Sequence, residues 1–394
     1  MEQTEFAETD TQVSANIRII GEPPRDTSLE PVEERSVLMD YLRSIPGILR
    51  KNKEQIVQQK AAETEFTQSF ERSFPDTELQ EAVVPHAIVF LHGQGRNAEM
   101  WRLWIKELRN LNPNMHIRMV AISLPKFDQK IPEDPDVVEN IFKAGEWWVG
   151  TGNLDMVREE GEVVRGIDIN SRVPVHEKRP NKLVGQDVNM ENVAEFVFDE
   201  LKKMGINGPV TVVGHSLGGL VGAVLASNHP DKVANLITIS SPYKANDRDY
   251  PIAFSKVIKV VRKLSDTPQS AIRQAREVFA FLLDKDIDEQ NMVSFVLENT
   301  PKSFASLVDR IREIDWESVL SRIPDSVRTV CYFKKNDAVV RAMGYQASTS
   351  LQNATLVYDP VGGHNMVEPI ILRRMVASIE NSYVKKEPPV IETD

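Results

Sequence analysis

One short segment has the residue types and spacing of a nucleophile turn. Gly214-His215-Ser216-Leu217-Gly218-Gly219 comes directly after the apolar run 210–213 and directly before a helical pattern. A very tight turn from strand to helix lifts its central side chain clear of a sheet, and flanking glycines leave room for that backbone. We therefore expect Ser216 to be a nucleophile.

A serine hydroxyl attacks well only when a base removes its proton. His364 is the best candidate, because it stands in a glycine-rich loop just beyond the last predicted strand, where it can approach the end of a sheet. The other histidines flank predicted strands, end a helix or lie in loops, an insertion or the turn itself: His86, His92, His116, His176, His215 and His229.

The third member of such a site is a carboxylate that orients the imidazole and stabilises its charged form. Asp337 is our first choice, because it follows the predicted strand 327–333 and precedes His364 in the order serine, acid, histidine. Asp359 is the alternative. It lies five residues before His364 in a turn that contains proline and glycine, where aspartate is a common turn former.

Acyl transfer also needs two amide donors for the oxyanion. Leu217, next to the nucleophile, would supply one. The second is expected from Gln94, because His92-Gly93-Gln94-Gly95 follows the predicted strand 87–91. The glycines let the backbone turn its amides inward, whereas His92 is expected to pack the loop.

The elements that would position these residues alternate between strands and amphipathic helices, which is typical of a mostly parallel sheet with crossover helices. The predicted fold class is therefore α/β, an open sheet with helices on both faces. The predicted strands are apolar, largely β-branched and bounded by turn residues: 87–91, 118–123, 210–213, 236–240, 327–333 and 354–358.

The rest of the chain divides by composition. Residues 1–33 are acidic and proline-containing and are predicted to be a flexible tail, as is 385–394. Residues 34–80 are predicted to be a helical extension that docks on its own domain, a partner or a membrane surface. The core domain is expected in 81–242, interrupted by a charged insertion at 126–185, and in 326–384, with an inserted helical cap at 243–325.

The composition argues against several classes of protein. The net charge of −11 argues against a nucleic-acid partner, because such binding depends on clustered Lys and Arg. Because Cys331 is the single cysteine, no intrachain disulfide can form. Its position in a predicted strand is typical of a small core residue. The first ten residues carry four acids and no base, unlike a secretory signal, and we find no apolar run long enough to span a membrane. We therefore expect a cytoplasmic protein.

Together the Gly214–Gly219 turn, the His92–Gly95 loop, Asp337 and His364 resemble the α/β-hydrolase superfamily of serine hydrolases over roughly residues 82–384. The resemblance implies an esterase-like or lipase-like enzyme with no cofactor and no metal, and a helical lid at 243–325 over the acyl pocket. One departure is that Lys126-Phe127-Asp128 follows Ser123-Leu124-Pro125, where many members carry a glycine-rich stretch that begins with aspartate.

The leading hypothesis is a serine hydrolase that cleaves a carboxylic ester or thioester of a small molecule or lipid. Two alternatives stay open. The fold could serve as a non-catalytic ligand receptor or interaction module, with the N-terminal helices engaging a partner or membrane, or the enzyme could transfer its acyl group to an alcohol.

Overall fold

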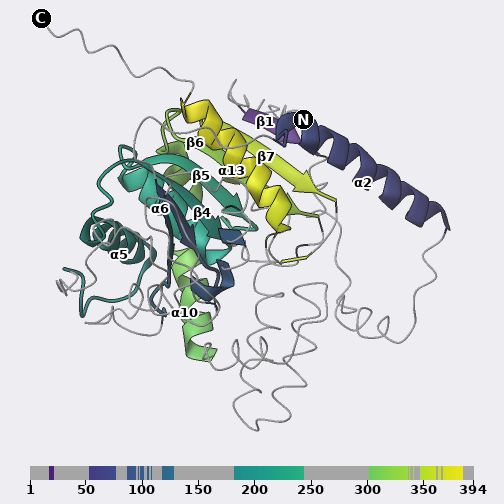
Figure 1. The fold of residues 1–394 in the computed structure, drawn as a ribbon. Helices are drawn as coiled ribbons and strands as arrows, with labels where there is room; N and C mark the ends of the chain where they lie inside the picture. Colours follow the sequence, from purple (N-terminus) through teal and green to yellow (C-terminus); the bar gives the residue numbers. More distant parts are fainter. Residues whose placement is uncertain are drawn as a thin grey trace, which may run out of the picture.

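The computed structural model describes the sheet, helices that cover it and loops at the ends of its strands (Figure 1). The described residues are 17–21, 53–76, 87–94, 96, 98–101, 104–105, 108, 118–127, 182–243, 301–335, 337, 340, 347–360, 363–364 and 367–384.

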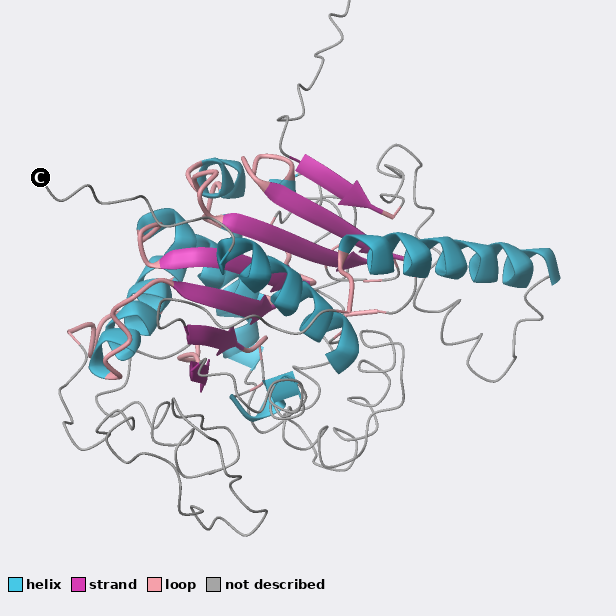
Figure 2. Cartoon of the chain, turned by 45° about the horizontal axis from the view of Figure 1, so that its top comes forward, coloured by secondary structure: helices cyan, strands magenta, loops and turns pink. Residues whose placement is uncertain are grey.

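The core of the molecule is an open seven-stranded sheet in which every pairing is parallel. Figure 2 shows the strand arrows pointing toward the same edge of the sheet. The strand order is β1-β7-β6-β5-β4-β2-β3. The strands are β1 (Ile17–Ile20), β2 (Ala87–Leu91), β3 (Arg118–Ile122), β4 (Val210–His215), β5 (Val233–Ile239), β6 (Arg328–Lys334) and β7 (Ala354–Asp359). The α/β fold class and the six predicted strands are confirmed, with ends that shift by a few residues.

Strand β1 corrects the prediction for the N-terminal segment. It lies inside residues 1–33, which we predicted to be a flexible tail, and it pairs in parallel with β7 from Ile17 opposite Ala354 to Ile20 opposite Val357. Four residues on an edge are too few to show a strand pattern, and their stability comes from the hydrogen bonds and contacts of β7. Gly21 ends the strand where a Cβ atom would lie 2.2 Å from the carbonyl oxygen of Tyr358, so the chains could not approach as closely with another residue.

Helices alternate with the strands, as predicted. They are α2 (Lys53–Ser73), the short 3₁₀ helix η1 (Ala98–Trp101), α5 (Met190–Lys203), α6 (Leu217–Asn228), α10 (Pro301–Arg312), α11 (Trp316–Ser321) and α13 (Pro369–Val384). Helix α5 begins where the Asn189 side chain accepts a hydrogen bond from the Asn192 amide, and it ends at Met204, before Gly205 adopts a φ of 68°. The ends of α5 are therefore set by its own sequence.

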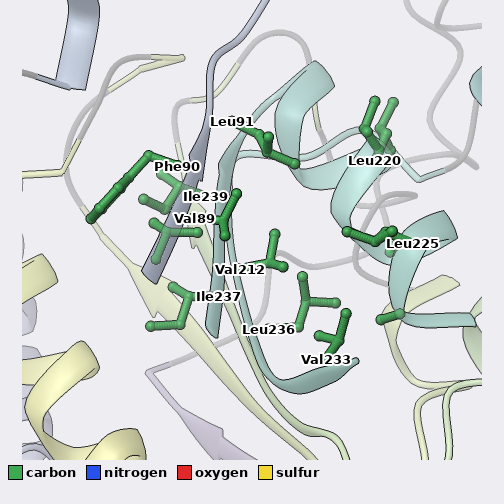
Figure 3. Close-up of a cluster of buried hydrophobic side chains, with 14 of the residues drawn as sticks. Val89, Phe90, Leu91, Val212, Leu220, Leu225, Val233, Leu236, Ile237 and Ile239 are labelled. Atoms are coloured by element: carbon green, nitrogen blue, oxygen red, sulfur yellow. The ribbon is translucent and has the colours of Figure 1, made fainter. Parts of the chain in front are cut away.

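Apolar side chains of β2, β4, β5 and α6 face one another in the middle of the molecule (Figure 3). Val89, Val212 and Leu236 are fully buried there. Strands that are covered on both faces read as continuous apolar runs, which explains why these strands were predictable.

The described part of the N-terminal extension packs on the sheet. Phe66 and Phe70 on α2 are buried, as is Phe74 directly after the helix, and the Phe70 ring lies edge-on to Tyr332 of β6 at 6.5 Å. Arg374 of α13 also pairs with Glu71 at 3.1 Å. Residues 53–76 thus pack on their own domain, while the helix predicted to begin near residue 37 lies outside the described residues up to 52.

Replacing Phe70 by alanine tests this docking. Loss of a buried aromatic ring leaves a cavity, so we expect the free energy of unfolding to fall by about 3–5 kcal/mol in urea titrations. Gln68→Ala changes an exposed residue of the same helix and should stay within about 0.5 kcal/mol of the parent. Equal stability of the two variants would show that α2 does not contribute its aromatic face to the core.

The predicted insertions are described only at their ends. Most of 126–185 lies outside the described residues, as does 244–300, whereas α10 and α11 occupy the last part of the predicted cap and are helical as expected. Among the described residues, no helix is long and apolar enough to cross a membrane.

Candidate active site

Ser216 occupies the corner between β4 and α6. Its backbone has a φ of 49° and a ψ of −114°, and its amide donates to the carbonyl of Ile239 at 2.8 Å. The left-handed φ is a strained conformation for a residue with a side chain, and such strain gathers at functional sites. The corner needs glycine behind it, because a Cβ atom on Gly218 would lie 2.1 Å from the Leu91 carbonyl oxygen.

His364 joins the serine to a carboxylate. Its Nε2 lies 2.9 Å from Ser216 Oγ, and its Nδ1 lies 2.9 Å from Asp337 Oδ2 and 3.0 Å from Oδ1. With Nδ1–H donating to Asp337, Nε2 is free to accept the Ser216 proton. The structure thus brings Ser216, His364 and Asp337 into one hydrogen-bonded chain.

Asp337 is held in place by the end of β6. Its amide donates to the Lys334 carbonyl at 3.1 Å, and its Oδ1 accepts the Val340 amide at 3.0 Å. The side chain is buried, so its orientation toward His364 is determined by these backbone contacts. The alternative acid, Asp359, instead accepts a hydrogen bond from the Tyr332 hydroxyl at 2.6 Å.

The two predicted amide donors flank the corner. Leu217 is the first residue of α6, and amides in the first turn of a helix have no partner within the helix. On the other side, the loop after β2 lies against the corner, since a Cβ atom on Gly93 would be 3.3 Å from Ser216 Cβ. Gln94 follows directly, so both predicted donors belong to segments beside Ser216. Helix N-termini also favour negative charge.

Two known protein families match parts of this chain. The family described as "alpha/beta hydrolase fold" matches residues 86–263, and the "PGAP1-like alpha/beta domain" matches residues 195–341. The first match covers β2 to β5 with the serine corner. Together with the parallel sheet, it shows the fold. The chain has the α/β-hydrolase fold, and its residues 86–263 match that family.

Individual proteins of known type are similar to this α/β hydrolase at low identity. The biotin biosynthesis bifunctional protein BioHC of Teredinibacter turnerae is 24% identical over 211 residues, which are 50% of this chain and 36% of the relative. A pimeloyl-[acyl-carrier protein] methyl ester esterase of Neisseria meningitidis is 29% identical over 168 residues, which are 40% of this chain and 63% of the relative. The chain therefore matches less than two thirds of the length of either relative.

Solved structures show the same fold. Esterase RhEst1 from Rhodococcus sp. has a TM-score of 0.50 and 16% identity, and the match covers 77% of this chain and 93% of the esterase. A hydrolase from Pseudomonas aeruginosa has a TM-score of 0.50 and 15% identity, with 77% of this chain and 92% of that chain covered.

In this α/β hydrolase, His92 has the packing role that we expected. Its Nδ1–H donates to the Gly93 carbonyl at 2.7 Å, and its Nε2 accepts the Leu124 amide at 2.6 Å. Burial lowers the pKa of His92 to about 4, while its hydrogen bond to Gly93 opposes that shift in part. The neutral ring thus ties the loop after β2 to the end of β3.

The pKa of His92 makes stability depend on pH. Between about pH 6.5 and 4 the unfolded chain binds a proton that the folded chain does not, so stability falls as pH falls. We expect His92 to account for a loss of about 3 kcal/mol across that window in urea titrations. His92→Gln keeps an acceptor but cannot titrate, and its stability should fall less steeply with acid. The same pH dependence in both proteins would contradict this assignment.

His215 has surroundings that sequence reasoning did not anticipate. Its ring centroid lies 5.3 Å from that of His364, and neither ring nitrogen has a hydrogen-bond partner among the described residues. Burial, followed by the charge of His364, lowers the pKa of His215 well below 6.5. The ring is therefore neutral beside His364. In the sequence, the only signal for a special role of His215 was its position inside the turn, next to Ser216.

Cys331 is fully buried in β6, as predicted for a small core residue. Burial raises the pKa of its thiol to about 12, so the nucleophilic thiolate is scarce at neutral pH. In this α/β hydrolase the candidate nucleophile is therefore Ser216 rather than the cysteine.

Proposed function

We propose that this protein is a serine hydrolase that cleaves a carboxylic ester or thioester through an acyl-enzyme intermediate. The observation that carries the proposal is the chain of hydrogen bonds from Ser216 through His364 to Asp337, with 2.9 Å at the serine and 2.9 Å at the carboxylate. The esterase named among the similar proteins supports the same reaction class.

In the first half of the reaction, Ser216 Oγ attacks the substrate carbonyl carbon while His364 Nε2 accepts its proton. Asp337 stabilises the imidazolium that forms. The amides of Leu217 and Gln94 donate to the oxyanion, at the positive end of α6. His364 then protonates the leaving alcohol or thiol, and Ser216 carries the acyl group.

In the second half, water attacks the acyl-enzyme with His364 as the base, and the acid product leaves. We propose that the segment 243–325, which includes α10 and α11, caps the acyl pocket. A small-molecule or lipid ester is the proposed substrate class, and the cytoplasmic location stays a prediction.

Labelling of the full chain with a fluorophosphonate probe, combined with hydrolysis of p-nitrophenyl esters of increasing acyl length, tests the proposal. We expect one label per chain and a burst of nitrophenol. His364→Gln should slow labelling by at least about 100-fold, because general-base assistance is lost. A folded protein that neither takes the label nor releases nitrophenol would favour the alternative hypothesis of a non-catalytic ligand receptor or interaction module. Acyl transfer to an added alcohol in preference to water would favour the acyltransferase.

A further inference from the structure

Trp104 connects two segments that are far apart in sequence. Its indole Nε1–H donates to the backbone carbonyl of Val367 at 2.9 Å. Trp104 follows the loop that carries Gln94, and Val367 lies three residues after His364. The hydrogen bond therefore ties the segment after the oxyanion loop to the segment that carries the histidine.

The loop that carries His364, between β7 and α13, contains residues that do not by themselves fix its conformation. Gly362 and Gly363 precede His364, and glycines allow many backbone conformations. Before them the chain is anchored at Asp359, whose carbonyl accepts the Lys335 amide at 2.8 Å. Beyond His364, α13 begins at Pro369, so the Val367 contact is placed where the loop regains regular structure.

Trp104 is itself supported by the sheet. Its ring packs edge-on against Trp101 with centroids 6.1 Å apart, and Trp101 packs against Phe90 of β2 at 5.2 Å. Trp101 and Phe90 are fully buried, and Val367 is 2% exposed. A column of aromatic rings thus runs from β2 to the Val367 carbonyl.

We propose that Trp104 is a positioning residue for His364: its indole hydrogen bond holds the loop so that His364 Nε2 stays within reach of Ser216. This inference rests on the proposed hydrolase function. Because a misplacement of about 1 Å can cost about 100-fold in rate, a single partly buried hydrogen bond at this place has a large effect on turnover.

The test compares Trp104→Phe with Trp101→Phe. Both substitutions replace an indole in the same aromatic column, but the Trp101 Nε1–H is buried with no hydrogen-bond partner among the described residues. Only the first variant therefore loses a hydrogen bond. We expect Trp104→Phe to lower kcat for a p-nitrophenyl ester by about 10- to 100-fold with little change in KM, and to slow fluorophosphonate labelling in parallel. Trp101→Phe should stay within about threefold of the parent.

A double variant separates positioning from general structural damage. In an His364→Ala background there is no imidazole left to position, so adding Trp104→Phe should not reduce the residual activity further. An equal loss in both backgrounds would overturn the inference, as would equal activity of the two tryptophan variants. Melting temperatures of all variants show whether each is folded at the assay temperature.

The outcomes also keep the two proposals apart. If the parent is labelled and the two tryptophan variants behave alike, the positioning role of Trp104 falls and the hydrolase proposal stands. If the folded parent is neither labelled nor active, both fall together.

Discussion

Ser216→Ala is expected to reduce kcat on any ester substrate by about 10⁵- to 10⁶-fold, the scale reached when the nucleophile of an acyl-transfer triad is removed. The hydroxyl is 2.9 Å from His364 Nε2, so the variant loses both the attacking atom and the proton that His364 would take. Steady-state hydrolysis and fluorophosphonate labelling both report this loss. Activity that survives would come from the oxyanion donors and substrate binding alone.

Ser240→Ala is the matched control. Ser240 is the other non-glycine residue with a left-handed φ, 51°, among the described residues, and it follows β5, the neighbour of β4. Its hydroxyl is buried and has no hydrogen-bond partner in the described structure. Removing it should leave kcat within about threefold. If Ser240→Ala were as inactive as Ser216→Ala, the strained sheet edge rather than the Ser216 hydroxyl would be the essential feature.

Asp337→Asn is expected to lower kcat by about 10⁴-fold, with little change in KM. The substitution keeps the shape of the side chain but removes the charge that stabilises imidazolium, and its amide group can favour the wrong tautomer of His364. Both carboxylate oxygens lie within 3.0 Å of His364 Nδ1, so the effect acts directly on the base. Single-turnover release of nitrophenol measures the chemical step.

Asp359→Asn distinguishes the two candidate acids. Asp359 accepts the Tyr332 hydroxyl at 2.6 Å and lies in β7, so its replacement should cost about 1–3 kcal/mol of unfolding free energy while kcat stays within about threefold. Urea titrations and the same kinetic assay measure the two effects. A larger kinetic loss in Asp359→Asn than in Asp337→Asn would reverse the assignment of the acid.

Much of the fold could be predicted because its signals are local. Strands that are buried on both faces appear as unbroken apolar runs, as in 87–91 and 210–213. Helix α5 shows its apolar face at a spacing of three and four residues and has its own cap at Asn189. The turn that carries Ser216 could also be predicted, since both the strand before it and the helix after it lie within one short segment.

Other features had no local signal. Strand β1 is four residues long in an acidic segment, and its place depends on pairing with β7, more than three hundred residues away. The Trp104–Val367 hydrogen bond likewise joins residues 263 positions apart. The neutral ring of His215, which has no hydrogen-bond partner within the described part of the chain, depends on what the folded chain packs around it.

The amino-acid sequence alone thus predicted the fold class, the turn with Ser216 and a few candidate catalytic partners of Ser216. These could be predicted because burial and turn chemistry act on neighbouring residues. The sequence left Asp337 and Asp359 both open. In the folded chain Asp337, which lies just beyond β6, is beside His364, whereas Asp359 at the end of β7 is beside Tyr332. This difference arises from the packing of the segments around the two strand ends, and it favours Asp337 as the proposed acid. Distances between groups on separate segments are properties of tertiary packing, and no local pattern encodes them.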